Sequence, residues 1–217
     1  MVIMETNKNM GGKQMNNYIC INGQQIELTE EQVKQICAAN GQEKIKLAEI
    51  PEGDTFKIGE HEFVVLEHSE GTTAIIRKEL FAGDMEFGSN NNFSGSYVED
   101  RCNEFAGEIA GIVGEENLVE HTVDLTADDG LKDYGIIKSR CSLLTTELYR
   151  RYVEILDKFK PDRWWWLATA HSTERHGNRS WVKSVSPSGY FDSLDCYYRD
   201  IGVRPFCILK SNIFVSK

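Results

Sequence analysis

The chain reads RWWWLATAHSTERHGNRSWVKSVSPSGYFDSLDCYYRDIGVRPFCIL from Arg163 to Leu209. Apolar runs typical of strands, at 164–169, 182–185 and 203–208, alternate here with long polar-aromatic segments. Side chains alternate between the two faces of a strand, so Trp164 and Trp166 should face one way and Trp165 the other. Three exposed tryptophans would favour aggregation. We therefore expect at least two of them in the core, and leave Trp181 open between a core anchor of the next strand and an exposed aromatic binding residue.

The polar segments between these runs show no burial period. Their Tyr, Ser, Asn, Gly and Arg content is typical of a binding surface carried on loops by a rigid sheet. Ordinary solvated loops remain the alternative reading. The candidate ligand-binding residues are His171, Arg175, His176, Asn178, Arg179, Ser180, Trp181, Tyr190, Asp192, Ser193, Asp195, Tyr197, Tyr198, Arg199 and Asp200.

Upstream of this region, the pattern predicts strands and then two helices. Residues 53–80 are strand-rich, with turns at Gly59 and Gly71, and 87–96 read as a loop. A helix is expected over 97–113, because apolar residues recur on one face. A second is expected over 142–159, before Pro161. Strands, two helices and a tail of short strands indicate an α+β fold with an antiparallel sheet. The apolar residues of the first helix are Val98, Cys102, Phe105, Ile109 and Ile112.

The N-terminal part of the chain has a different character. Residues 1–14 are polar and expected to be a disordered tail. A small ββα unit is predicted over 15–43, with a hairpin turn at Asn22-Gly23 and a capping box from Thr29 to Gln32. Residues 44–50 read as a linker to the main domain, 50–217.

The bulk composition bounds the function. The 217 residues carry a formal net charge of -10, which disfavours nucleic acid and anionic membranes as partners. We find no secretory signal and no apolar run long enough for a membrane helix. A cytoplasmic product as synthesised is expected, with later association with a phage particle or a cell surface left open. The oligomeric state is also left open.

The residues that could support catalysis or metal binding form weaker patterns than the candidate binding residues. Cys207 lies in an apolar run and should be buried, whereas Cys196 is expected to be exposed. A thiol nucleophile at Cys196 paired with His171 is an alternative, although closeness in sequence does not establish closeness in space. The acidic stretch 123–135 resembles a calcium loop, but with Gly130 in sixth place the first ligand position falls on Leu125. We therefore expect a solvated acidic loop, and no metal site, cofactor or catalytic residue.

Several motifs, taken in order, carry a family resemblance. The runs CSLLTTELYRRY, WWWLAT, VSPSG and GVRPFCIL resemble the variable proteins of diversity-generating retroelements, found in bacteria and phages. The similar subtype is the one related to formylglycine-generating enzyme. The resemblance covers about 50–217 and implies a C-type-lectin-like fold with two main helices, a small antiparallel sheet and long C-terminal loops. It places the candidate variable region at 164–208.

The resemblance also implies a function. In that family an error-prone reverse transcriptase copies a template RNA, and adenines in Asn codons become the source of Tyr, Ser, Asp, His, Arg and Gly. Most candidate residues are of these types, although Glu174, Trp181 and Lys183 are outside the reach of such codons. The implied protein is non-catalytic and binds a protein or glycan. The alternatives are a formylglycine-generating or other thiol enzyme on the same fold, and a structural component of a phage or prophage.

Overall fold

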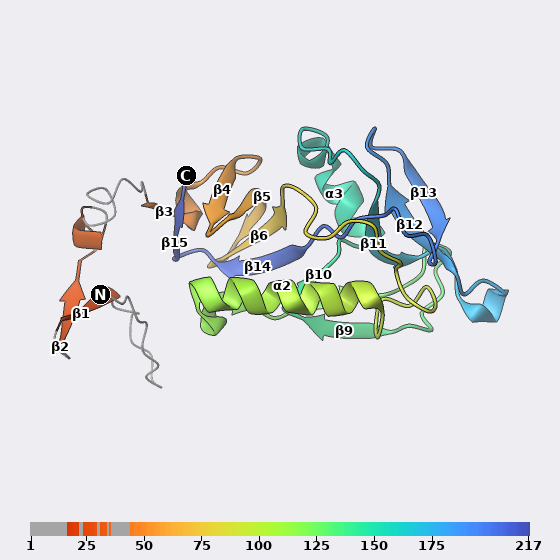
Figure 1. The fold of residues 1–217 in the computed structure, drawn as a ribbon, viewed down its shortest axis with the longest axis horizontal. Coiled ribbons are helices and arrows are strands. Elements are labelled where there is room, and N and C mark those ends of the chain that lie inside the picture. The colour runs from red at the N-terminus through yellow and green to blue at the C-terminus, as the bar shows by residue number, and fades with distance from the viewer. Residues whose placement is uncertain (1–16, 22–23, 30, 34, 36–43) are drawn as a thin grey trace.

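The computed structural model describes residues 17–21, 24–29, 31–33, 35 and 44–217. Its main sheet has eight strands in the order β10–β14–β6–β5–β4–β15–β3, with β7 beside β14 (Figure 1). All of its strand pairs are antiparallel, as the sequence predicts. The strands are β3 (Lys44–Lys46), β4 (Thr55–Ile58), β5 (His61–Ser69), β6 (Thr72–Arg77), β7 (Leu118–Val119), β10 (Cys141–Ser142), β14 (Phe206–Lys210) and β15 (Phe214–Ser216).

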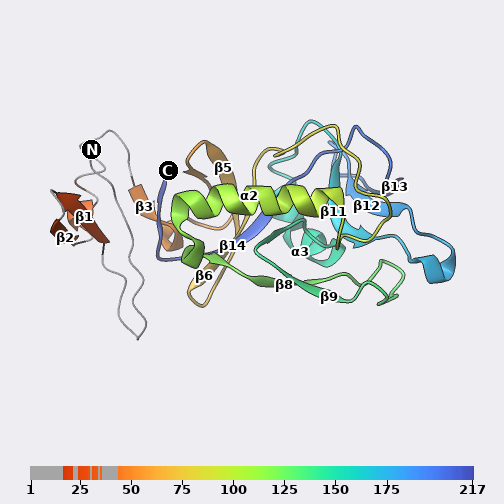
Figure 2. The ribbon, with the colours of Figure 1, turned by 60° about the horizontal axis from the view of Figure 1, so that its bottom comes forward.

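Two helices cover opposite faces of this sheet and create two cores. Strand β5 shows the division, because Phe63 and Val65 pack in the core under α2 (Tyr97–Val113). Val64 and Leu66 pack in the core under α3 (Thr146–Leu156). Figure 2 shows α2 running along its own side of the sheet. The mixed α+β architecture predicted from the element order is therefore confirmed.

The two helices match the sequence to different degrees. Helix α2 has the predicted bounds, and Ser96 caps it by accepting a hydrogen bond from Glu99 N–H. Four of the five residues predicted for its apolar face are buried, but Ile112 is 53% exposed near the end of the helix. Helix α3 begins four residues later than predicted, because 141–142 form β10 and the Thr145 hydroxyl caps the helix.

A second sheet carries the C-terminal loops. Its three strands are β11 (Trp165–Ala170), β12 (Trp181–Val185) and β13 (Phe191–Asp195), in that order. The tryptophans divide between the cores as alternation predicts. Trp166 and the partly buried Trp164 pack with the α2 core, and Trp165 packs with the α3 core. The expectation that at least two are core residues is confirmed.

The GVRPF segment, 202–206, joins the two sheets. Gly202 N–H donates to Trp164 O (2.8 Å) and Gly202 O accepts from Trp166 N–H (3.0 Å), while Val203 pairs with Ala82. A Cβ on Gly202 would lie 2.3 Å from the Leu80 side chain, so any larger residue here would require Leu80 to move. This segment therefore fixes β11 against the main sheet.

The remaining elements lie at the edges. Strands β8 (His121–Asp124) and β9 (Ile136–Ser139) form a separate ribbon, and β1 (Asn17–Ile21) and β2 (Gln24–Leu28) form the predicted hairpin. Thr29 and Gln32 exchange the hydrogen bonds of a capping box. The tail 1–14, the hairpin turn at 22–23 and most of the predicted N-terminal helix lie outside the described residues.

The prediction that 44–50 form a linker is wrong. Strand β3 pairs with β15 near the C-terminus, and the next turn, η1 (Leu47–Glu49), buries Leu47. Ile50 is also buried, so this segment contributes to the main core. Among the described residues, we find no helix with both the length and the apolar character needed to cross a membrane.

Candidate functional site: the loop face

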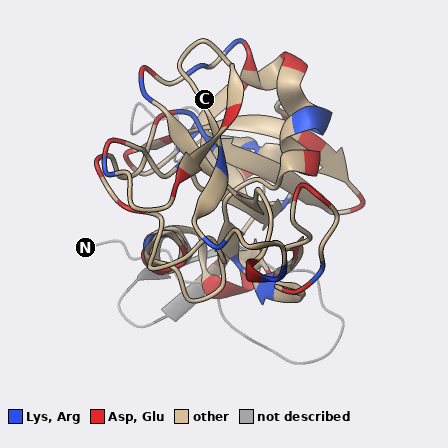
Figure 3. Ribbon diagram, turned by 90° about the vertical axis from the view of Figure 1, so that its right-hand side faces the viewer, with Lys and Arg blue, Asp and Glu red and all other residues tan. Residues whose placement is uncertain are grey.

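The candidate residues lie in β12, in β13 and in the loops that adjoin the β11–β12–β13 sheet, on the side of the molecule that faces the viewer in Figure 3. We call the exposed surface formed by 171–181 and 190–200 the loop face. All fifteen candidate residues are exposed or half-buried there, whereas the strand residues Trp165, Trp166 and Val182 are almost completely buried. The fold thus separates a packed framework from accessible polar-aromatic residues.

Hydrogen bonds and an ion pair connect the loop 171–180 to the acidic stretch 123–135, which the sequence predicts to be solvated. Asp129 accepts a hydrogen bond from the Ser172 hydroxyl (2.6 Å) and lies 3.1 Å from His176 Nδ1. Asp133 accepts from the Thr173 hydroxyl (2.5 Å) and pairs with Arg175 (2.7 Å). The prediction of a solvated loop is confirmed in that 128–130 and 132–133 are exposed, but their carboxylates also satisfy the polar groups of a second loop.

The Asp129 contacts should make the loop sensitive to acid. The Ser172 hydroxyl, which donates to Asp129, lowers the pKa of this carboxyl group. A lowered folded-state pKa stabilises the fold above the unfolded value of about 4, and this contribution is lost as the pH falls through the folded pKa. We expect amide protection over 172–177, corrected for intrinsic exchange, to fall in that acidic range.

Asp129→Asn should remove this pH dependence of amide protection. The control Asp162→Asn, at an exposed carboxylate, should retain it. Equal dependence of protection on pH in the two variants would contradict the role of Asp129.

Asn91 connects three segments beneath the loop face, and sequence reasoning missed it. The residue is fully buried, and its Nδ2 donates to Ser172 O (2.9 Å) and Trp181 O (3.1 Å). Its Oδ1 accepts from the Tyr134 hydroxyl (2.5 Å), and its N–H donates to Arg179 O (2.8 Å). The only signal was its position in the Asn-rich run 90–92, which is equally typical of a solvated loop.

Four aromatic side chains are exposed among the candidates. Trp181, Tyr190, Tyr197 and Tyr198 are 48%, 62%, 50% and 56% exposed. Of the two alternatives for Trp181, the core anchor is therefore wrong, since this first residue of β12 is exposed and its ring lies 5.7 Å from that of His171.

The strand register places these aromatics in two groups. Trp181 pairs with Asp195 at one end of the β12–β13 ladder, and Val185 pairs with Phe191, beside Tyr190, at the other. Four residue steps of about 3.4 Å each separate the two ends. Tyr190 therefore lies apart from Trp181, whereas Tyr197 directly follows the Asp195 end and donates its hydroxyl to Ser89 O (2.9 Å).

Neighbouring loops hold most of the remaining candidates. Asn178 Oδ1 accepts from the backbone N–H groups of Ser180 (3.2 Å) and Trp181 (3.0 Å), which turns the chain into β12. Ser193 Oγ lies 3.2 Å from His171 Nδ1. Arg199 pairs with Glu86 (2.8 Å). The site thus includes Glu86, Asp129 and Asp133, which the sequence did not single out.

Cys196 does not fit the role of a nucleophile. The prediction of exposure is wrong, since the side chain is completely buried in the α2 core. Burial, with the nearby Asp195 charge as a second cause, raises the pKa of its thiol to about 11, whereas reactive thiols have lowered values. His171 contacts Ser193, which alternates with the core-facing Leu194, so His171 and Cys196 belong to opposite sides of β13.

The other described thiols are also buried. Cys207 is buried as predicted, together with Cys102 and Cys141. Burial, followed by contacts with the other two thiols, raises the pKa of Cys141. Within the described ranges, no group of three or more His, Cys, Asp or Glu residues is placed to hold a metal ion.

No protein-family model, curated protein or solved structure matches the chain. The function of the chain is therefore inferred from its sequence and from the geometry of the loop face.

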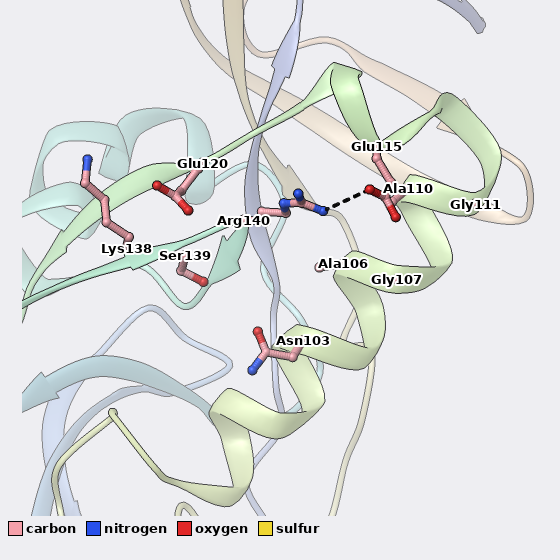
Figure 4. Close-up of a pocket in the computed structure, with 10 residues that line it drawn as sticks. All are labelled: Asn103, Ala106, Gly107, Ala110, Gly111, Glu115, Glu120, Lys138, Ser139 and Arg140. Atoms are coloured by element: carbon pink, nitrogen blue, oxygen red, sulfur yellow. Dashed lines mark ion pairs between the residues drawn. The ribbon is translucent and has the colours of Figure 1, made fainter. Parts of the chain in front are cut away.

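A cavity of about 500 Å³ lies away from the loop face, between α2 and the β8–β9 ribbon (Figure 4). Ala106, Gly107, Ala110 and Gly111 form its helical side, and its charged rim includes the Arg140–Glu115 pair at 3.9 Å. None of the candidate residues lines it, so the sequence-based binding site and this cavity are separate features.

Proposed function

We propose that the chain is a non-catalytic ligand-binding protein with a C-type-lectin-like fold, and that its loop face is a recognition surface diversified by a retroelement. The observation that carries the proposal is the separation of accessible from buried positions. Every candidate residue is solvent-accessible, and the runs expected to stay constant supply the buried Trp165, Trp166 and Val203. Substitutions at accessible loop positions usually change stability little, so such a surface tolerates variation.

The residues outside codon reach agree with this division in part. Lys183 is buried and pairs with Asp128 (3.5 Å), so it belongs to the fixed framework. Glu174 and Trp181 are exposed. They contribute to the loop face as constant residues, or they derive from template codons of another type.

A thiol enzyme on the same fold is the weaker proposal. Its nucleophile would be Cys196, which is buried and has a raised pKa. Binding rather than chemistry is therefore the better account of the loop face.

Sequencing the surrounding locus tests the proposal. We expect a near-identical repeat downstream of the gene that differs at adenines of the template, together with a reverse transcriptase gene. The differing codons should fall at candidate positions such as Arg179, Tyr198 and Asp200, and should spare those of Trp165 and Val203. A locus with neither feature would overturn diversification.

A further inference from the structure

The charges of the loop face are unequally neutralised. Two of its arginines pair with acids of neighbouring segments: Arg175 with Asp133 (2.7 Å) and Arg199 with Glu86 (2.8 Å). The buried Lys183, which lies outside the loop face, pairs with Asp128 (3.5 Å). His176 likewise faces Asp129 at 3.1 Å. These cations are held by the protein itself, and a ligand anion would have to compete with carboxylates already in place.

The acids of the loop face outnumber its free cations. Within the part of the chain that the structure describes, Arg179 is the only arginine or lysine of 171–181 and 190–200 without an ion pair. Four carboxylates of the same segments also have none, so the accessible charge is net negative. These carboxylates are Glu174, Asp192, Asp195 and Asp200.

One of these carboxylates lies beside the exposed tryptophan. Asp195 is the register partner of Trp181, and residues directly opposite on antiparallel strands have Cβ atoms about 5 Å apart on the same face. The Asp195 carboxylate is oriented by accepting a hydrogen bond from Tyr197 N–H (3.1 Å). A tryptophan face is the best aromatic surface for a cation, and an adjacent carboxylate adds a charge-assisted hydrogen bond.

We propose that Trp181 and Asp195 receive a lysine or arginine side chain from a basic segment of a partner protein. This inference rests on the proposed recognition function and names the chemistry of its ligand. The net charge of -10 would steer such a partner toward the chain. An exposed tryptophan can also stack on a sugar ring, but a neutral glycan would leave the surplus carboxylates unpaired and an acidic glycan would be repelled.

Binding of short labelled peptides to the full chain, followed by fluorescence anisotropy, tests the inference. The probes are oligoarginine, oligolysine and oligoglutamate peptides and a neutral oligosaccharide. We expect the two basic peptides alone to bind, with affinity falling as salt rises. Trp181→Ala should weaken binding about 3- to 30-fold, within the range of a cation–π contact, and Trp181→Phe should have an intermediate effect.

The matched control separates a specific contact from general attraction. Asp195→Asn and Glu60→Gln each remove one exposed or half-exposed negative charge, but Glu60 lies in the β4–β5 turn, outside the loop face. We expect a loss of several-fold for Asp195→Asn and no change for Glu60→Gln. Equal losses for the two, no effect of Trp181→Ala, or binding of the oligosaccharide in place of the basic peptides would each overturn the inference.

The outcome is independent of the locus experiment. A locus without a template repeat, combined with peptide binding that depends on Trp181, would remove diversification and keep the cation site. A locus with the repeat and a chain that ignores basic peptides would keep diversification and remove the cation site.

Discussion

Arg204→Met is expected to lower the free energy of unfolding by about 3 kcal/mol, because it leaves buried carbonyl groups without donors. Arg204 is 1% exposed, and its guanidinium donates to Arg77 O (2.9 Å), Lys78 O (3.1 Å) and Phe159 O (2.8 Å). It also lies 5.2 Å from the centre of the Trp165 ring. Burial lowers its pKa to about 10, so it stays charged at neutral pH and the carbonyl dipoles and the ring stabilise that charge.

Urea denaturation of three variants separates the causes. Arg204→Lys keeps the charge but lacks the planar fork that reaches several carbonyls together, so we expect a loss similar to that of Arg204→Met. Arg204→Ala also loses the packing of the aliphatic part of the side chain. It should lower the free energy of unfolding by at least about 1 kcal/mol more than Arg204→Met does. A lysine variant as stable as the unchanged chain would show that charge alone matters, and a methionine variant of unchanged stability would contradict the role of the hydrogen bonds.

Periodic features of the sequence predicted the framework well. The bounds of α2 and the division of the tryptophans between two cores follow from the 3.6-residue and two-residue periods. Both periods report burial of one side of a single element. They therefore hold wherever that element is covered along its whole length, as at Trp165 and Trp166.

The same periods fail at the ends of elements. Trp181 begins β12 and is 48% exposed, whereas Val185, on the same face at the other end of the strand, packs in the α3 core. Cys196 follows β13 by one residue and turns back into the core. Strand β3 escaped notice because its partner β15 lies at the opposite end of the chain, and three-residue strands have too few positions to show alternation.

Polar contacts between distant segments have no local pattern at all. The hydroxyl groups that donate to Asp129 and Asp133 lie 43 and 40 positions away in the sequence. The two carbonyl oxygens that accept from Asn91 Nδ2 lie 81 and 90 positions away. Each of these residues is also a common loop residue. The residues that could reach a ligand were therefore predictable from composition, whereas the residues that hold them in place needed the structure.

Asn91→Ala is the second substitution for which we expect a large loss in the free energy of unfolding. The Asn91 side chain connects three segments beneath the loop face, and alanine cannot make these hydrogen bonds. The substitution removes the Asn91 partner of Ser172 O and of the Tyr134 hydroxyl, and leaves Trp181 O with the hydrogen bond from His171 N–H (2.8 Å), which should cost about 2 to 3 kcal/mol. We expect amide exchange over 172–181 to rise more than exchange in α2. Asn90→Ala is the control, since Asn90 is exposed and its side chain accepts from the neighbouring Asn92 N–H (2.8 Å).

Asn91→Asp tests the direction of the hydrogen bonds with nearly the same shape. A carboxylate can still accept from the Tyr134 hydroxyl, but it cannot donate to the two carbonyl oxygens. Burial and those oxygens should raise the pKa of the new carboxyl group in the folded state, so its destabilising effect is present at neutral pH and diminishes as acidification restores a proton. Unfolding measured at several pH values should show the variant approaching Asn91→Ala or falling below it at pH 7, and recovering relative to it in acid. If the aspartate variant matches the unchanged chain at pH 7, the two donated bonds do not hold the loop face.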